Sequence, residues 1–168
     1  EKECKNVKEN VGLLDMTAFA KCRIKGPGAE EFLDKLVANK LPKKIGRINL
    51  CHALNTKGGV HSEFTIMRES ENSFYLVSAG AYQRLDHDWI FGWMPKDGSV
   101  QFENLTNSKG VLVVSGPKAR ELMQRDSNDD FSNENFKWLS AKQVDVGFAP
   151  VNAMRVNFVG ELGWELHH

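Results

Sequence analysis

Two carboxylates near the C-terminal end of the chain stand among glycines and large apolar residues. Glu161 lies between Gly160 and Gly163, and Glu165 follows two residues after Gly163. A glycine weakens a strand interior, so paired glycines indicate a bulge or a close approach of a ligand to the backbone. A carboxylate at such a place can accept two parallel hydrogen bonds from a flat donor pair, such as a guanidinium or the pterin N3–H and 2-amino group. The alternative is an edge strand whose glutamates face water.

The segment around Glu161, residues 157–167, alternates as a strand does, and we predict a strand there. The residues of its apolar face are Phe158, Leu162, Trp164 and Leu166, and those of the opposite face are Val159, Glu161 and Glu165.

A second group of residues that can do chemistry flanks a predicted hairpin at residues 55–59, which have the composition of a tight turn. Alternation in the strand that follows places His61, Glu63 and Thr65 on a polar face, opposite Val60, Ser62, Phe64 and Ile66. If Leu54 pairs with Val60, Cys51 lies opposite Glu63 on the polar face. This face is then either a solvated sheet surface or a metal site made by Cys51, His61 and Glu63. The metal site is disfavoured because no second histidine has ligand spacing.

The composition excludes several classes of protein. The 168 residues contain 22 basic and 22 acidic side chains and no dense basic block, which argues against a nucleic-acid or membrane-surface binder. No apolar run approaches the roughly 18 residues that a spanning helix needs. Three widely spaced cysteines favour reduced thiols in a cytosolic or matrix compartment. The chain begins with Glu1 and not methionine, and we expect an excised piece or a mature fragment.

Two strand–Gly-Pro–helix patterns organise the chain and predict pseudo-symmetric halves. In the first, Gly26-Pro27 precedes a predicted helix at 29–38, and in the second Gly116-Pro117 follows a predicted strand at 111–114. The elements predicted between them are strands at 47–54, 60–67 and 74–78 and a helix at 82–93. Short strands with hairpin turns, interrupted by helices, favour an antiparallel α+β fold over a doubly wound parallel sheet. No Gly-x-Gly-x-x-Gly motif is present for a flavin or nicotinamide dinucleotide.

Four segments agree in order and spacing with one known family. They are residues 12–19 (GLLDMTAF), 54–63 (LNTKGGVHSE), 113–119 (VVSGPKA) and 160–166 (GELGWEL). The chain resembles the aminomethyltransferase family, which includes the T-protein of the glycine cleavage system. It looks most similar to the C-terminal parts of dimethylglycine and sarcosine dehydrogenases.

The resemblance implies a folate-binding domain over residues 1–167 with two interleaved lobes of antiparallel sheets and flanking helices. Lobe A would comprise about residues 22–121, and lobe B about 1–21 with 122–167, with folate in a channel between them. The family continues well beyond this point, so we expect a C-terminal truncation, and His168 is interpreted as a tag residue.

The resemblance also implies the site. Glu63 matches an aspartate of the T-protein and would act as the catalytic acid–base group beside the reactive folate nitrogens. Phe158 stands where the T-protein has a tyrosine, Phe19 where it has a methionine, and Ala79 where it has an amide. The residues expected to bind the cofactor are Phe19, Glu63, Ala79, Phe158, Gly160 and Glu161, and no metal ligand is expected.

The function implied is tetrahydrofolate-dependent one-carbon transfer. The domain would capture the iminium or formaldehyde from demethylation of dimethylglycine or sarcosine as 5,10-methylene-tetrahydrofolate. The expected partners are the folate, the one-carbon donor and a linked flavin oxidoreductase domain that carries FAD, with no nucleic acid and no membrane. The expected compartment is the mitochondrial matrix or the bacterial cytoplasm. The alternatives are a non-catalytic folate-binding regulatory or assembly protein, and a free-standing aminomethyltransferase.

Overall fold

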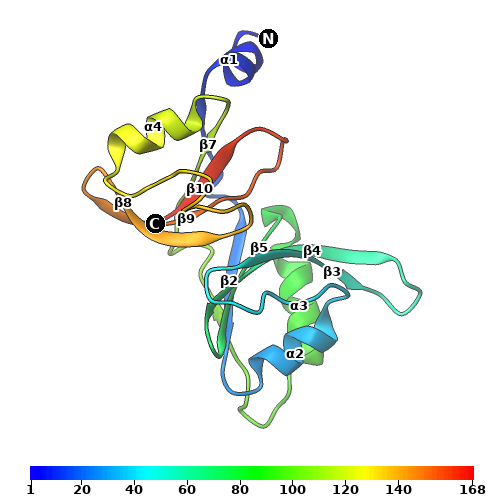
Figure 1. Cartoon of the computed structure of the whole chain (residues 1–168). Helices are drawn as coiled ribbons and strands as arrows, with labels where there is room; N and C mark the ends of the chain where they lie inside the picture. Colours follow the sequence, from blue (N-terminus) through cyan, green and yellow to red (C-terminus); the bar gives the residue numbers. More distant parts are fainter. The chain divides into compact units, whose positions relative to one another are not determined.

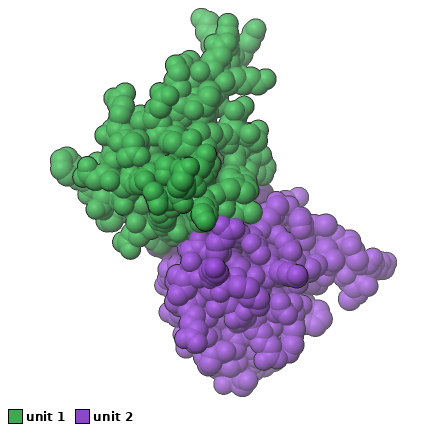
Figure 2. All heavy atoms as spheres, in the orientation of Figure 1, with its two compact units in different colours: residues 1–17, 109–168 green, residues 18–108 purple.

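The computed structural model describes all residues 1–168, which form two compact units (Figures 1 and 2). Unit 1 comprises residues 1–17 and 109–168, and unit 2 comprises residues 18–108. Each unit is built on one five-stranded sheet whose strand pairs are all antiparallel. Helices flank the sheets, so the predicted antiparallel α+β class is confirmed. None of these helices combines the length and the apolar character that a membrane crossing needs.

The sheet of unit 2 has the strand order β3-β4-β5-β2-β6. Its strands are β2 (Ala20–Lys25), β3 (Ile48–Leu54), β4 (Val60–Ser70), β5 (Ser73–Ser78) and β6 (Gln101–Asn104). Its helices are α2 (Ala29–Leu36), the short 3-10 helix η1 (Gly80–Tyr82) and α3 (Gln83–Trp93).

The core of unit 2 lies between one face of this sheet and the helices α2 and α3 (Figure 1). Alternate residues of the strands enter it, such as Cys51 on β3 and Phe64 on β4. Helix α2 contributes Phe32 and Leu33, which belong to the apolar side of the helix. Because the strands alternate with period two, the other residues of β3 and β4 point away from the helices.

The sheet of unit 1 has the strand order β1-β7-β10-β9-β8. Its strands are β1 (Gly12–Asp15), β7 (Val111–Ser115), β8 (Ala141–Val146), β9 (Ala149–Met154) and β10 (Gly163–His167). Its helices are α1 (Lys2–Glu9) and α4 (Ala119–Asp126).

Trp164 of β10 is the largest side chain in the core of unit 1 and is fully buried. The rings of Phe131 and Phe136 meet it edge-on, with centroids 5.3 and 5.9 Å away. His168 exchanges two backbone hydrogen bonds with Gly110, of 3.0 and 3.1 Å. These bonds hold His168 in the fold of unit 1, and its interpretation as a tag residue stays a prediction.

The two units divide the chain differently from the expected lobes at residues 109–121. These residues hold β7 and the start of α4, which the expectation grouped with residues 22–108. Strand β7 instead pairs with β1 on one side and β10 on the other, both in unit 1.

The predicted strand at residues 157–167 is wrong in its first half. Residues 157–162 form a loop, and the strand β10 begins only at Gly163. Gly160 has a φ of 82°, in the left-handed region that no strand uses, and Asn157 Oδ1 accepts a hydrogen bond from the Val159 N–H (2.6 Å). Turn chemistry at these positions therefore overrides the apolar alternation.

Candidate functional site

Three predicted site residues of unit 2, Phe19, Glu63 and Ala79, lie at the same end of its sheet. Glu63 is on β4, Ala79 directly follows β5, and Phe19 directly precedes β2. The ladders β4–β5 and β2–β5 end with the pairs Thr65–Val77 and Ala20–Ser78. Continuing each register brings Ala79 beside Glu63 and Phe19 beside Ala79. A Cβ placed on Gly80 would lie 3.8 Å from the backbone nitrogen of Phe19, which supports this proximity.

The backbone after Ala79 is fixed by a hydrogen bond between β5 and α3. The Ser78 hydroxyl donates to Asp86 Oδ2 at 2.6 Å, and Asp86 is buried. Because an unpaired buried carboxylate is costly, this bond ties the end of β5 to the first turn of α3. The position of Ala79 is therefore set by the fold of unit 2.

Glu63 points to the face of the sheet that α2 and α3 do not cover. Its neighbour Phe64 is buried in the core, while the Glu63 side chain is 50% exposed. His52 lies directly opposite Glu63 on β3, and its Nε2 is 2.8 Å from Glu63 Oε2. The other carboxylate oxygen, Oε1, has no partner in the protein.

The expected pairing of Cys51 with Glu63 is wrong, because a β-bulge shifts the register between Ala53 and Leu54. Cys51 pairs with Phe64 and faces the core, where burial raises the pKa of its thiol to about 11. Cys51 therefore lies on the other face of the sheet from Glu63 and does not share a metal site with it.

The bulge also separates His61 from Glu63. The His61 ring stacks on the Trp89 indole of α3 with centroids 4.2 Å apart, so it lies on the helix side of the sheet. Cys51, His61 and Glu63 therefore do not converge, and the structure has no group of three or more His, Cys, Asp or Glu side chains that could hold a metal ion.

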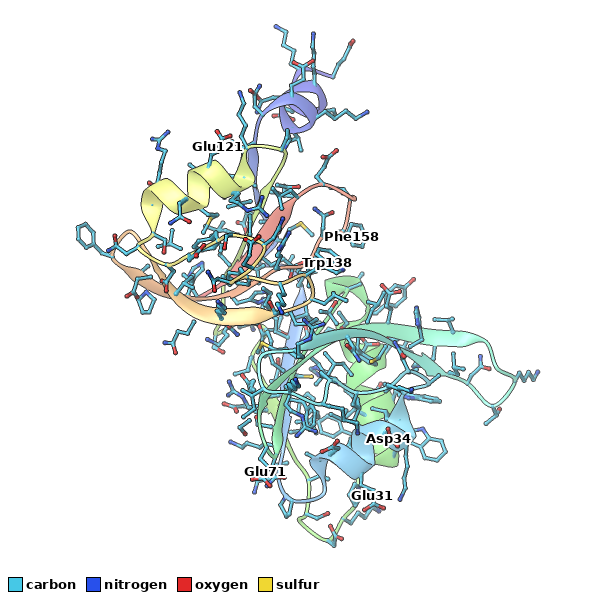
Figure 3. All side chains as sticks on the ribbon, in the orientation of Figure 1. Glu31, Asp34, Glu71, Glu121, Trp138 and Phe158 are labelled. Carbon is cyan, nitrogen blue, oxygen red and sulfur yellow. The ribbon has the colours of Figure 1, made fainter.

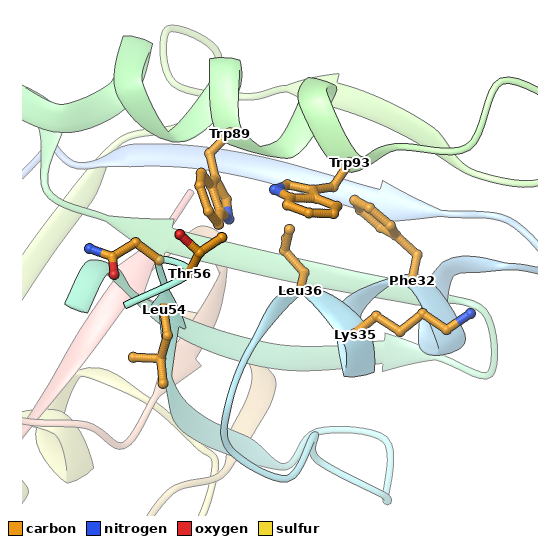
Figure 4. Close-up of a pocket in the computed structure, with 8 residues that line it drawn as sticks. Phe32, Lys35, Leu36, Leu54, Thr56, Trp89 and Trp93 are labelled. Carbon is orange, nitrogen blue, oxygen red and sulfur yellow. The ribbon is translucent and has the colours of Figure 1, made fainter. Parts of the chain in front are cut away.

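An apolar pocket of about 280 Å³ lies on the helix side of unit 2 (Figure 4). Its lining residues come from α2, α3 and the β3–β4 hairpin: Phe32, Lys35, Leu36, Leu54, Asn55, Thr56, Trp89 and Trp93. No carboxylate lines it. Glu63 faces the other side of the sheet, so this pocket does not belong to the predicted site.

The predicted site residues of unit 1, Phe158, Gly160 and Glu161, all lie in the loop before β10. The Phe158 ring is 87% exposed and projects from this loop (Figure 3). Glu161 is half-buried, and its carboxylate has no hydrogen bond or ion pair within the protein. The loop thus presents an aromatic ring and an unpaired anion close together in the chain.

His52 is the residue that sequence reasoning missed, because the bulge could not be counted from the sequence. One signal could have found it. His52 is a polar residue between the small apolar residues Cys51 and Ala53, which is typical of a solvent-facing position in a half-buried strand.

Comparison with known proteins places the whole chain in one family. The family model described as the GCVT N-terminal domain matches residues 1–168. Human mitochondrial dimethylglycine dehydrogenase is 39% identical over 167 residues, which cover 99% of this chain. The mouse mitochondrial pyruvate dehydrogenase phosphatase regulatory subunit is 31% identical over 170 residues, again 99% of this chain. The chain spans 19% of the length of each of these two relatives.

Among solved structures, the glycine cleavage system aminomethyltransferase T from Bartonella henselae has a TM-score of 0.84 and 20% sequence identity. The match covers 99% of this chain and 44% of that one. At this identity the likeness establishes the fold.

Proposed function

We propose that this chain, which belongs to the GCVT N-terminal domain family, transfers one-carbon units to tetrahydrofolate. The one-carbon unit would be the iminium or formaldehyde released when dimethylglycine or sarcosine is demethylated, and the product would be 5,10-methylene-tetrahydrofolate. The relation to dimethylglycine dehydrogenase supports this choice of donor.

The loop before β10 has the groups that a reduced pterin requires. The unpaired carboxylate of Glu161 can accept two hydrogen bonds from the N3–H and 2-amino edge. The exposed Phe158 ring offers a stacking surface in the same loop. Both groups lack partners within the protein, so binding would satisfy Glu161 without breaking an existing bond.

Glu63 carries the proposed chemistry. Tetrahydrofolate, when bound, supplies the nitrogens that attack the one-carbon electrophile. The free oxygen of Glu63 would accept the proton that the attacking nitrogen releases and pass it to water. Its negative charge would also stabilise the positive charge that develops on the adduct. Phe19 and Ala79, beside it in the same row, are apolar and would limit water at this position.

The observation that carries the proposal is the state of the Glu63 carboxylate. It is exposed, it faces away from the core, and one of its oxygens has no partner. A glutamate that served only stability would gain little in such a place, because exposed ion pairs contribute about 0–1 kcal/mol.

The experiment is a stopped-flow measurement of methylene-tetrahydrofolate formation from tetrahydrofolate and formaldehyde. The protein is expected to accelerate trapping above the uncatalysed solution reaction and to saturate with folate. A rate equal to the uncatalysed rate, with folate bound, would contradict the proposal.

That contradicting outcome would favour a second candidate, a folate-binding domain with a regulatory role. The 31% identity to the pyruvate dehydrogenase phosphatase regulatory subunit is the observation in its favour. Calorimetry separates the two candidates, because the regulatory candidate requires folate binding without acceleration of trapping.

A third candidate is a free-standing aminomethyltransferase, which would require transfer from an aminomethylated carrier protein. The stopped-flow assay can test it with that carrier in place of formaldehyde.

The oxidation that generates the electrophile needs a flavin, and we place it in a different domain of the same polypeptide. The share of the curated relatives that this chain spans, 19%, leaves room for such a domain in them. The mitochondrial relatives support a matrix location, with the bacterial cytoplasm as the corresponding compartment in bacteria.

A further inference from the structure

The pair formed by His52 and Glu63 joins two neighbouring strands on the exposed face of unit 2. Nε2 of His52 lies 2.8 Å from Glu63 Oε2, and the two residues are directly opposed in the β3–β4 ladder. A carboxylate only accepts hydrogen bonds, so Nε2 must carry the hydrogen and His52 must donate. The bond uses one acceptor site of Oε2 and leaves Oε1 entirely free for a ligand.

The backbone of His52 is held from both sides. On one side it pairs with β4, and on the other the Ala38 N–H donates to the His52 carbonyl at 2.8 Å. Asn39 Nδ2 donates in the same way to the Leu50 carbonyl at 2.6 Å. The imidazole therefore projects from a fixed strand, although β3 is an edge strand of the sheet.

Glu63, in contrast, has a long side chain that is 50% exposed. Without a partner, such a side chain samples several rotamers, and ordering it costs conformational entropy. A catalytic carboxylate must meet its proton in a defined geometry, since small displacements reduce rates strongly. A hydrogen bond from a fixed imidazole supplies this order before the ligand arrives.

We infer that His52 is a positioning residue that holds Oε2 of Glu63 so that Oε1 faces the reacting nitrogen. This inference rests on the function proposed for Glu63. It assigns His52 no contact with the folate, so its removal should slow the reaction and leave folate binding nearly unchanged.

The test compares three variants in the trapping assay at saturating folate. His52→Ala removes the donor, and His52→Gln keeps one, because the glutamine amide nitrogen lies about as far from the backbone as Nε2. His87→Gln is the matched control, since it removes an imidazole from α3 on the helix side of the same unit. We expect His52→Ala to lower kcat roughly tenfold, which corresponds to about 1.4 kcal/mol. His52→Gln should keep kcat within about threefold, and His87→Gln should match the wild type.

Three outcomes would overturn the inference: full kcat in His52→Ala, a loss of folate affinity as large as the loss of kcat, or equal damage from His52→Gln and His52→Ala. The last of these would mean that the imidazole is needed for something other than a donated hydrogen bond.

A second measurement is independent of activity. Nitrogen-15 NMR of the histidines should find His52 protonated at Nε2, with a chemical shift that moves in Glu63→Gln. Nε2 without its proton would overturn the inference. If the wild type does not accelerate trapping but the NMR result holds, the proposed function fails and the hydrogen bond stands.

Discussion

The two candidate carboxylates stand on different kinds of backbone. Glu63 lies in the interior of the strand β4, opposite His52, which binds one of its oxygens. Glu161 lies in a loop that turns at Gly160 with a φ of 82°, and nothing in the protein binds its carboxylate. Under the proposed function, Glu63 would therefore be oriented before any ligand arrives, whereas Glu161 would obtain its partners from the ligand.

This difference matches two different tasks. A group that moves a proton benefits from a fixed geometry that needs no reorganisation. A group that recognises a ligand can remain unpaired, because the ligand then supplies its hydrogen bonds and none within the protein has to be broken. We therefore expect changes at Glu63 to affect rate and changes at Glu161 to affect affinity.

Glu63→Gln should have the largest effect. The amide cannot accept the proton, so the trapping rate at saturating folate should fall roughly 100-fold, the usual scale for a positioned acid–base group. Folate affinity should stay within about tenfold, or 1.4 kcal/mol. Glu63→Asp should retain more activity than the amide despite its shorter reach. Equal trapping rates for the wild type, Glu63→Gln and Glu63→Asp in stopped-flow measurements would mean that Glu63 is an ordinary sheet-surface residue.

Glu161→Gln should give the complementary result. The amide accepts on one side only, and tetrahydrofolate binding should weaken by about 1.5–3 kcal/mol in calorimetry. Glu121, an exposed residue of α4 in the same unit, provides the matched control Glu121→Gln, which should bind as the wild type does (Figure 3). A slower reaction with unchanged folate affinity in Glu161→Gln would contradict the expectation that Glu161 affects affinity and Glu63 affects rate.

The third test concerns how well the core of unit 2, on the other face of the sheet from Glu63, excludes water. Burial, with a smaller contribution from the charge of Asp86, raises the pKa of Cys22 in β2 from 9.0 to about 12. Above pH 9 the unfolded chain loses this proton while the folded protein keeps it, so stability is lost as pH rises from 9 toward 12. From pH 8 to pH 10 the wild type should lose about 1.4 kcal/mol of unfolding free energy relative to Cys22→Ala, measured by urea titration. An unchanged difference would mean that the sheet admits water at β2.

The smallest effect is expected from two matched glycine substitutions. Gly58 and Gly160 have φ values of 79° and 82°, and a Cβ on either would meet nothing within 4 Å. Alanine in this left-handed conformation costs about 1 kcal/mol at both positions. Only Gly160→Ala should weaken folate binding, by roughly fivefold. Equal folate affinities for the two variants would mean that the backbone geometry at Gly160 does not contribute to folate recognition.

The regular elements could largely be predicted from the sequence, because their apolar periodicity coincides with burial. The helix predicted at 29–38 is α2, Ala29–Leu36, and the strand predicted at 47–54 is β3, Ile48–Leu54. The helix predicted at 82–93 is α3, Gln83–Trp93, preceded by η1. In each case one side of the element is buried, so its apolar residues recur in the sequence with the period of a helix or a strand.

Features that depend on non-local geometry could not be predicted. The bulge between Ala53 and Leu54 changes which residue faces Glu63, and no periodicity records a single extra residue. Helix α1 was not predicted, because it buries no side chain and only two of its eight residues, Cys4 and Val7, are apolar. The turn at Gly160 was hidden because the apolar residues around it happen to alternate. The site residues expected from the family resemblance remain predictions, and the resemblance did not indicate His52.

The order of the strands in unit 1 has a consequence for synthesis of the chain on the ribosome. Strand β1 is made before its partner β7, which follows about a hundred residues later, after all of unit 2. At typical elongation rates this delay lasts roughly 5–20 s, during which β1, with Leu13 and Leu14, has no strand to pair with. Unit 2 has its complete set of strands by then, so β1 is the segment most open to wrong pairing during translation.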